Sequence, residues 1–164
     1  PNFKRIPEPL LKAKEAGIPI LRLNKGDILS RGRVKLNVLW PDKDSMPKNL
    51  SVNDRSLALH FDLDGVSLLT SGDLGKKYEM NAALPADILK SSHHGSKSAT
   101  QEEFLSKVSP EYILVSVSET KEHQLDNIIQ MAENLNQTLL TTYDDGAILI
   151  HCKDGEINIK DWKR

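Results

Sequence analysis

Short apolar segments alternate with segments of helical pattern through the second half of this 164-residue chain, and that alternation limits its possible folds more than any other feature. Single strand-like stretches separated by helical stretches are typical of a sheet with helices packed on it. In the first half, strand patterns follow one another more closely, and the dipeptide at residues 64–65 is Asp-Gly, a hairpin turn signal. The sequence therefore predicts a layered α/β domain with a mixed β-sheet.

Turn residues and periodicity predict the individual elements. Pro7 and Gly17 bound a short helix, and the polar segment 41–54 predicts an exposed loop. Thr100 precedes Glu103 by three residues, the spacing of a capping box, so we expect Thr100 to cap a helix. The other expected helices are 74–84 and 125–135. The expected strands are 18–23, 33–40, 56–63, 66–71, 86–92, 112–117, 139–143, 147–151 and 156–159. We expect 139–143 and 147–151 to pair with each other around the turn at 144–146.

Composition excludes several classes of protein. The chain is 38 % apolar and 27 % charged, as in globular domains, and no apolar run approaches the roughly 20 residues of a membrane-spanning helix. The 22 basic and 23 acidic residues give a net charge of −1, so any contact with nucleic acid must be local. The one cysteine, Cys152, excludes an internal disulfide and a Cys-based zinc knuckle, and we expect it to fill an apolar segment.

Polar residues follow two of the predicted strands. Ser71-Gly72-Asp73 ends one, and His93–Ser96 begins twenty positions after Asp73. Side chains at strand ends are exposed on a rigid backbone, and a carboxylate with imidazoles suits a divalent ion such as zinc or manganese. An ordinary Gly-Asp turn and a solvated histidine pair would have the same sequence. The pattern alone therefore does not decide between a metal site and ordinary surface residues.

The run from Ser56 to Ser96 resembles the metallo-β-lactamase-fold domain of the competence DNA-uptake proteins (ComEC type) and its stand-alone relatives. The resemblance rests on the hairpin ending in Leu-Leu-Thr-Ser-Gly-Asp and on Ala-Asp-Ile-Leu-Lys-Ser-Ser-His-His-Gly-Ser. It covers nearly the whole chain, and further landmarks lie in the same order at 17–20, 38–41, 53–56 and 143–148.

The resemblance implies an αββα sandwich with a binuclear site for zinc or manganese, used to hydrolyse a phosphodiester or another ester. Asp73 would be a catalytic carboxylate that bridges two metal ions, and His93 or His94 a further ligand. We favour His94, although adjacent residues of an extended chain point in opposite directions and the choice stays open. His123 lies where the family has a Gly-His-Pro motif, but Glu122 and Gln124 flank it here.

A substrate phosphate would lie near the same loop. We expect the Ser96 hydroxyl to contact a phosphate oxygen and Lys97, together with Lys90, to supply positive charge, although lysines are also ordinary surface residues. The resemblance makes single-stranded DNA, or another phosphoester, the expected partner. The parent protein would then lie in the cell membrane with this domain outside the bilayer, or be secreted if the domain stands alone.

The earlier ligand motif of the family, His-x-His-x-Asp-His or His-x-Asp-x-Asp-His, does not precede Ser56. The segment His60–Asp64 matches the second form superficially, but Gly65 follows it, so we interpret it as a polar strand face and a turn. His151 is likewise interpreted as a sheet residue. We therefore expect residues 1–164 to be a single metallo-β-lactamase-like domain that lacks its N-terminal portion, with sheet edges that favour a homo-oligomer.

Three alternatives stay open. The chain could be a non-catalytic docking or DNA-guiding module with a degenerate metal site. It could be a secreted stand-alone ester hydrolase. A plain α/β domain without metal would place Asp73 and the histidines far apart.

Overall fold

The computed structural model describes residues 7–118 and 125–162 and contains a seven-stranded sheet with a separate two-stranded hairpin. The order in the large sheet follows the chain from β1 to β7; β1 to β4 pair antiparallel, and β4 to β7 pair parallel. The α/β class with a mixed sheet is thus confirmed. The strands are β1 (Ile28–Arg31), β2 (Val34–Trp40), β3 (Ala58–Leu63), β4 (Val66–Thr70), β5 (Ile88–Lys90), β6 (Tyr112–Val115), β7 (Thr138–Thr141), β8 (Ala147–Lys153) and β9 (Glu156–Trp162). The α-helices are α1 (Glu8–Glu15), α2 (Lys76–Glu79), α3 (Glu102–Val108) and α4 (Asp126–Asn134). The 3-10 turns are η1 (Asn53–Arg55), η2 (Met80–Ala82) and η3 (Ser92–Gly95).

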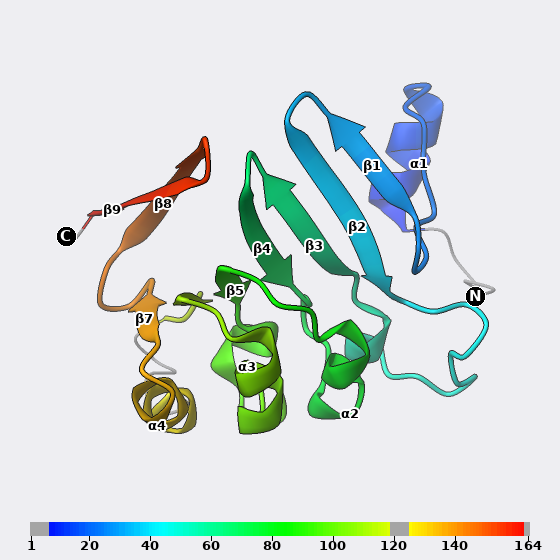
Figure 1. The fold of residues 1–164 in the computed structure, drawn as a ribbon. Helices are drawn as coiled ribbons and strands as arrows, with labels where there is room; N and C mark the ends of the chain where they lie inside the picture. Colours follow the sequence, from blue (N-terminus) through cyan, green and yellow to red (C-terminus); the bar gives the residue numbers. More distant parts are fainter. Residues whose placement is uncertain (1–6, 119–124, 163–164) are drawn as a thin grey trace.

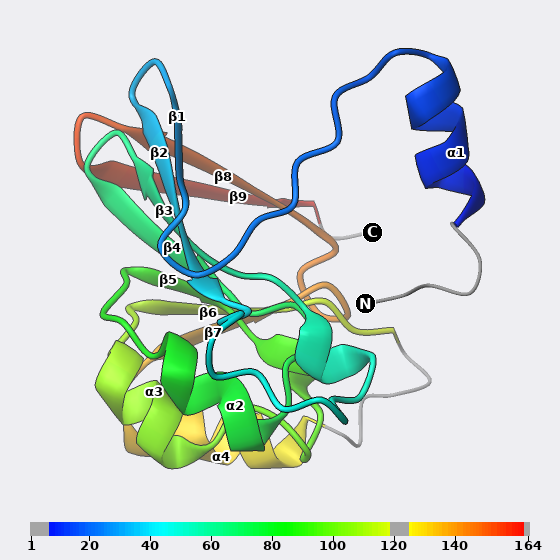
Figure 2. The ribbon, with the colours of Figure 1, turned by 90° about the vertical axis from the view of Figure 1, so that its right-hand side faces the viewer.

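Helices α2, α3 and α4 lie together on one side of the sheet, and the β8–β9 hairpin lies on the other (Figures 1 and 2). Helix α1 buries none of its residues and stands away from the sheet (Figure 2). Within 7–118 and 125–162, no helix is both long and apolar enough to cross a membrane.

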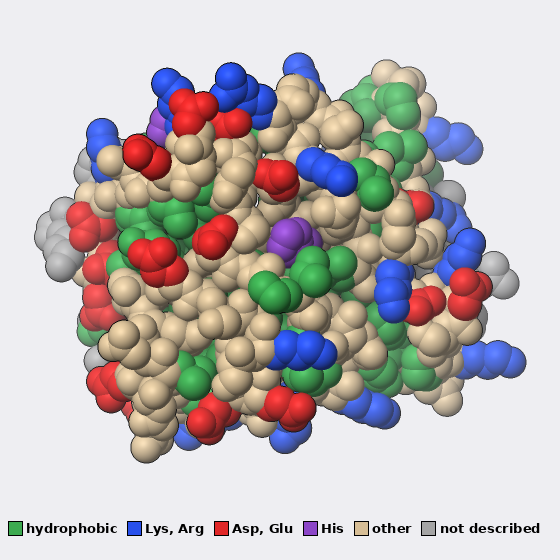
Figure 3. All heavy atoms as spheres, in the orientation of Figure 1, with side chains coloured by type: hydrophobic (Ala, Val, Ile, Leu, Met, Phe, Trp, Pro, Cys, Tyr) green, Lys and Arg blue, Asp and Glu red, His purple; other side chains and the backbone are tan. Residues whose placement is uncertain are grey.

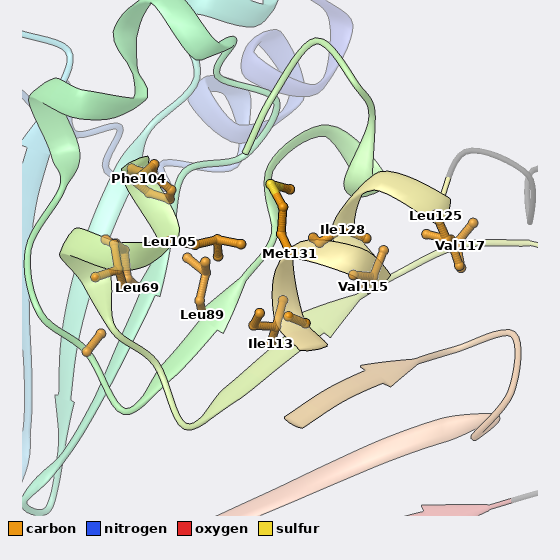
Figure 4. Packing of buried hydrophobic residues seen from close by; sticks show 13 residues of the cluster. Leu69, Leu89, Phe104, Leu105, Ile113, Val115, Val117, Leu125, Ile128 and Met131 are labelled. Carbon is orange, nitrogen blue, oxygen red and sulfur yellow. The ribbon is translucent and has the colours of Figure 1, made fainter. Parts of the chain in front are cut away.

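The main core lies between the parallel strands and helices α3 and α4, where Leu69, Leu89 and Ile113 meet Phe104 and Ile128 (Figure 4). Central strands of a parallel sheet are covered by helices, so their residues are almost continuously apolar. This core fixes the carboxyl ends of β4, β5 and β6, from which the candidate site extends.

The tip of the β8–β9 hairpin is joined to the tips of two other hairpins. The Arg33 guanidinium lies 3.0 Å from Asp64 Oδ2 and 2.9 Å from Asp154 Oδ1, and Gly155 N–H donates to Asp64 O at 2.9 Å. Asp154 and Gly155 have φ of 50° and 82°, both positive as in the tight turn of a two-residue hairpin.

One predicted strand is wrong, and one observed strand was not predicted. Residues 18–23 form no strand, because Pro19 offers no N–H to a ladder and Ile18 and Leu21 are exposed without a partner strand. Strand β1, which was not predicted, pairs with β2 across Gly32 instead. The signal for this hairpin is Gly32-Arg33, a two-residue turn that begins with glycine.

The predicted pair of 139–143 with 147–151 is also wrong. Strand β7 pairs parallel with β6, and β8 pairs with β9. Asp144 Oδ2 accepts a hydrogen bond from Thr141 Oγ1 at 2.7 Å, and Asp145 Oδ2 accepts one from Thr141 N at 2.8 Å. These bonds close a local turn that leads the chain out of the sheet.

Candidate functional site

The loops that follow β4 and β5 are in contact. The N–H of His93 donates to Gly72 O at 2.9 Å, and the buried hydroxyls of Ser71 and Ser92 are hydrogen-bonded to each other. The Asp-bearing and His-bearing loops, which lie twenty positions apart in sequence, therefore form one cluster at the carboxyl edge of the sheet. This is the edge at which ligands bind in open α/β sheets.

Gly72 allows Asp73 to approach this edge. Its φ is +58°, and a Cβ built there would lie 2.9 Å from Ser56 Cβ and 3.1 Å from Ser56 Oγ. The same Ser56 Oγ accepts the N–H of Asp73 at 3.1 Å. A side chain at position 72 would therefore displace the group that fixes the backbone of Asp73.

The histidine loop has a left-handed backbone. His93, His94 and Gly95 have φ of 45°, 57° and 74° in succession, a conformation that is unfavourable for non-glycine residues. Gly95 is required for a second reason, since a Cβ there would lie 3.1 Å from Val115 Cγ1. Strain of this kind is found mostly where the position of a side chain matters.

The contacts of His94 fix its orientation. Nδ1 lies 2.8 Å from Ser116 O. Because a carbonyl oxygen only accepts, Nδ1 is the donor in this contact, and in the neutral ring the lone pair is then on Nε2. A backbone carbonyl bonded to one ring nitrogen is the usual support of a histidine that binds metal through the other.

The other predicted residues of this loop have weaker contacts. His93 Nδ1 lies 3.5 Å from Ser98 Oγ, a long contact. The Ser96 hydroxyl is bonded within the loop, to Ser98 Oγ at 2.9 Å, and Lys97 is exposed. Both lie beside the histidines, and their contact with substrate stays a prediction.

A buried polar network supports the loop from beneath. Glu79 is fully buried, its Oε1 accepts a hydrogen bond from Thr100 Oγ1 at 3.3 Å, and Thr100 Oγ1 is 3.2 Å from Ser91 Oγ. Burial raises the pKa of Glu79, and the nearby donors of Ser92, Thr100 and Gln101 offset this only in part.

The Thr100 hydroxyl is thus bound to Glu79 and does not cap a helix. The φ of Thr100 is +46°, and α3 begins after Gln101, which makes no side-chain cap. The predicted capping box is wrong, because the partner of Thr100 lies 21 residues away and no local pattern reveals it. Sequence reasoning missed Glu79 for the same reason.

Lys90, the last residue of β5, is partly buried beside this cluster. Its Nζ donates to Ser91 O at 2.9 Å. Burial lowers the pKa of Lys90, and the negative charge of Asp73 acts in the opposite direction. Asp73 and Lys90 are therefore near enough to interact, although they form no ion pair within 4.0 Å in the described part of the chain.

Two side chains at this edge are suitable ligands for a metal ion. A carboxylate (Asp73) and an oriented imidazole (His94) are ligands that zinc and manganese accept. Within 7–118 and 125–162, however, no three His, Cys, Asp or Glu side chains converge closely enough to hold an ion. Because a stable site takes three or four protein ligands, the described residues supply suitable donors but an incomplete set. His123 lies outside the described residues.

The remaining histidines lie elsewhere. His60, in β3, has its Nε2 3.1 Å from Pro85 O, and Asp62 Oδ1 accepts the N–H of Gly65 in the following turn. His151 is exposed on β8. Figure 3 shows acidic and basic side chains both spread over one face of the molecule, in keeping with the net charge of −1.

Comparison with known proteins relates the chain to competence proteins. It is 30 % identical over 152 residues to ComE operon protein 3 of Bacillus subtilis (strain 168), a match that covers 88 % of this chain and 19 % of that protein. It is 35 % identical over 80 residues to Competence protein ComA of Neisseria gonorrhoeae, covering 45 % of this chain and 12 % of that protein. The chain thus spans about a fifth or less of each relative. No protein-family model matches it.

Proposed function

We propose that this chain acts in bacterial competence as a domain that handles incoming DNA, and that Asp73 and His94 are two ligands of a divalent-metal phosphodiesterase site. The further ligands would come from outside the described residues. A divalent cation held there would activate water for attack on a phosphodiester. The likeness to segments of two competence proteins supports the biological role.

The observation that carries the proposal is the contact between the two loops. The bond from His93 N–H to Gly72 O joins the loops that carry Asp73 and His94 at one sheet edge. The bond from Nδ1 of His94 to Ser116 O leaves Nε2 as the ring nitrogen that can bind a metal ion. A plain α/β domain gives no reason for a strained histidine pair at this position.

A second candidate is a DNA-guiding module without catalysis. The incomplete set of metal donors in the described part of the chain favours it. The two candidates differ in one measurable property, which is whether Asp73 and His94 bind a metal ion.

Titration with Mn²⁺, followed by NMR on the ¹⁵N-labelled chain, separates them, because this paramagnetic ion broadens signals from nearby amides. We expect selective broadening at residues 72–73 and 93–95, weakened in both Asp73→Asn and His94→Gln. His151→Gln, which changes an exposed histidine on β8, is the matched control and should leave the broadening unchanged.

Broadening that is insensitive to Asp73→Asn and His94→Gln would refute the metal ligands. If such a protein still binds single-stranded DNA, the guiding module is the better description. Where both ligand variants lose the broadening, cleavage of single-stranded DNA with added Mn²⁺ is the next assay of the hydrolase.

A further inference from the structure

Lys90 occupies an unusual place for a lysine. It is the last residue of β5, a central strand whose neighbours β4 and β6 run parallel to it, so it lies at the carboxyl edge of the sheet. The side chain is partly buried there. Burying an ammonium group is unfavourable unless its charge and its N–H groups find partners.

The described protein groups satisfy this ammonium incompletely. Ser91 O accepts one of its three N–H bonds at 2.9 Å, and within 7–118 and 125–162 no second acceptor and no carboxylate within 4.0 Å is found for Nζ. Asp73 attracts it from a greater distance. Two N–H groups of the Lys90 ammonium, and a positive charge without a carboxylate close beside it in the described residues, are therefore available to a ligand.

Two hollows lie beside Lys90 and His94. Lys90 lines one of about 170 Å³, together with the polar Ser116 and Thr142 and the apolar Leu114, Val115 and Ile148. Ser116 also lines a neighbouring hollow of about 320 Å³, into which His94 and Ser118 are exposed. Both hollows are lined by Ser116, so a nucleic-acid backbone that reached both of them would pass Lys90 and His94.

We propose that Lys90 is an anion-binding residue that holds one phosphate of a single-stranded DNA backbone next to the Asp73–His94 edge. This inference rests on the proposed function, since it names the group of the substrate that the edge would hold. A phosphate diester carries one negative charge and oxygens that accept hydrogen bonds, which matches the two available N–H groups of one partly desolvated ammonium. Lys35, in contrast, is exposed on β2 and serves as the control.

The test compares wild type with Lys90→Met, Lys90→Arg and the control Lys35→Met for binding of fluorescein-labelled oligo-dT, with EDTA present and the salt concentration varied. Methionine keeps the apolar stem of Lys90 and removes the charge, so this variant should fold at least as well as wild type. Each phosphate contact to single-stranded nucleic acid contributes about −0.7 to the slope of log K against log salt.

We expect Lys90→Met to weaken oligo-dT binding about tenfold and to flatten the salt slope by about 0.7, while Lys90→Arg restores most of the affinity. Lys35→Met should change the affinity by less than about twofold and leave the slope unaltered, because this exposed lysine lies on β2, which β3 and β4 separate from β5. Equal affinity and slope for wild type and Lys90→Met would overturn the inference, and so would failure of wild type to bind oligo-dT at low salt.

The outcome is independent of the metal question. Because EDTA removes divalent ions, Lys90 can fail this test while Asp73 and His94 still show Mn²⁺ broadening, and the reverse result is equally distinguishable. Unfolding curves of each variant show whether a loss of binding reflects a loss of fold.

Discussion

Replacement of Gly72 by alanine should destabilise the protein through one identifiable clash. Gly72 and Gly32 have nearly the same φ, +58° and +60°, but a Cβ at Gly32 meets nothing within 4 Å. Gly32→Ala therefore measures the left-handed strain alone. That strain is about 1–2 kcal/mol, partly offset by about 0.4–1 kcal/mol from the stiffer unfolded chain.

Gly72→Ala adds two further losses. The new methyl would lie 2.9 Å from Ser56 Cβ, and such overpacking typically destabilises by about 1–3 kcal/mol. Displacing Ser56 also weakens the bond from Asp73 N–H to Ser56 Oγ, which is worth about 0.5–1.5 kcal/mol. We expect the free energy of unfolding to fall by about 2–4 kcal/mol more in Gly72→Ala than in Gly32→Ala.

Urea unfolding, followed by circular dichroism, measures this difference, and an unchanged slope with denaturant shows that the unfolded states are comparable. A chain of this size should also lose about 2–4 °C of Tm per kcal/mol. In a Ser56→Gly background the clash is absent, so Gly72→Ala should cost no more there than Gly32→Ala. If the two alanine variants are equally stable in the wild-type background, the close approach of Gly72 to Ser56 is refuted.

Two further predictions concern buried groups. Burial raises the pKa of Glu79 above its ordinary value of 4.5, so the native state binds more protons than the unfolded state and stability falls as pH rises from that value through the raised pKa. Glu79→Gln removes this titration. The free energy of unfolding of the variant minus that of wild type should therefore increase as pH rises from 4.5 through the raised pKa, and then level off. A difference that does not change with pH would contradict the raised pKa of Glu79. Leu69→Ala, at a side chain that is 0 % exposed, should lower the free energy of unfolding by about 2–5 kcal/mol, whereas Leu21→Ala, at a side chain that is 69 % exposed, should change it by less than about 0.5 kcal/mol, as measured by the same urea curves.

The predictability of this fold depended on how local each signal is. The alternation of apolar segments identified the strands at Ile88–Lys90 and Tyr112–Val115, because each of these segments is itself rich in apolar residues. Strand prediction failed where the formation of a strand depends on whether a partner strand is present. Residues 18–23 are as apolar as a strand but have no neighbour, while Ile28–Arg31 pairs because a two-residue turn returns it to β2.

The candidate site divides in the same way. Asp73 and the histidines could be proposed from the sequence, because strand ends and residue types are local properties. The burial of Glu79 and the partial burial of Lys90 could not be predicted, since a buried carboxyl and a partly buried ammonium are defined by what packs around them. Thr100 shows the difference most clearly, because its sequence matches a capping box while its hydroxyl is hydrogen-bonded to Glu79 instead of to a helix N-terminus.

The energy stored in the histidine loop argues against an ordinary surface turn. Holding His93 and His94 in the left-handed region costs about 2–4 kcal/mol at roughly 1–2 kcal/mol for each residue, and glycine at either position would remove most of its share. The loop nevertheless carries two imidazoles, and buried hydroxyls, the Gly72 carbonyl and Ser116 O all bind it. A turn that served only to reverse the chain would gain nothing from these side chains. The strain is explained if the imidazole of His94 must face the edge where Asp73 and Lys90 lie.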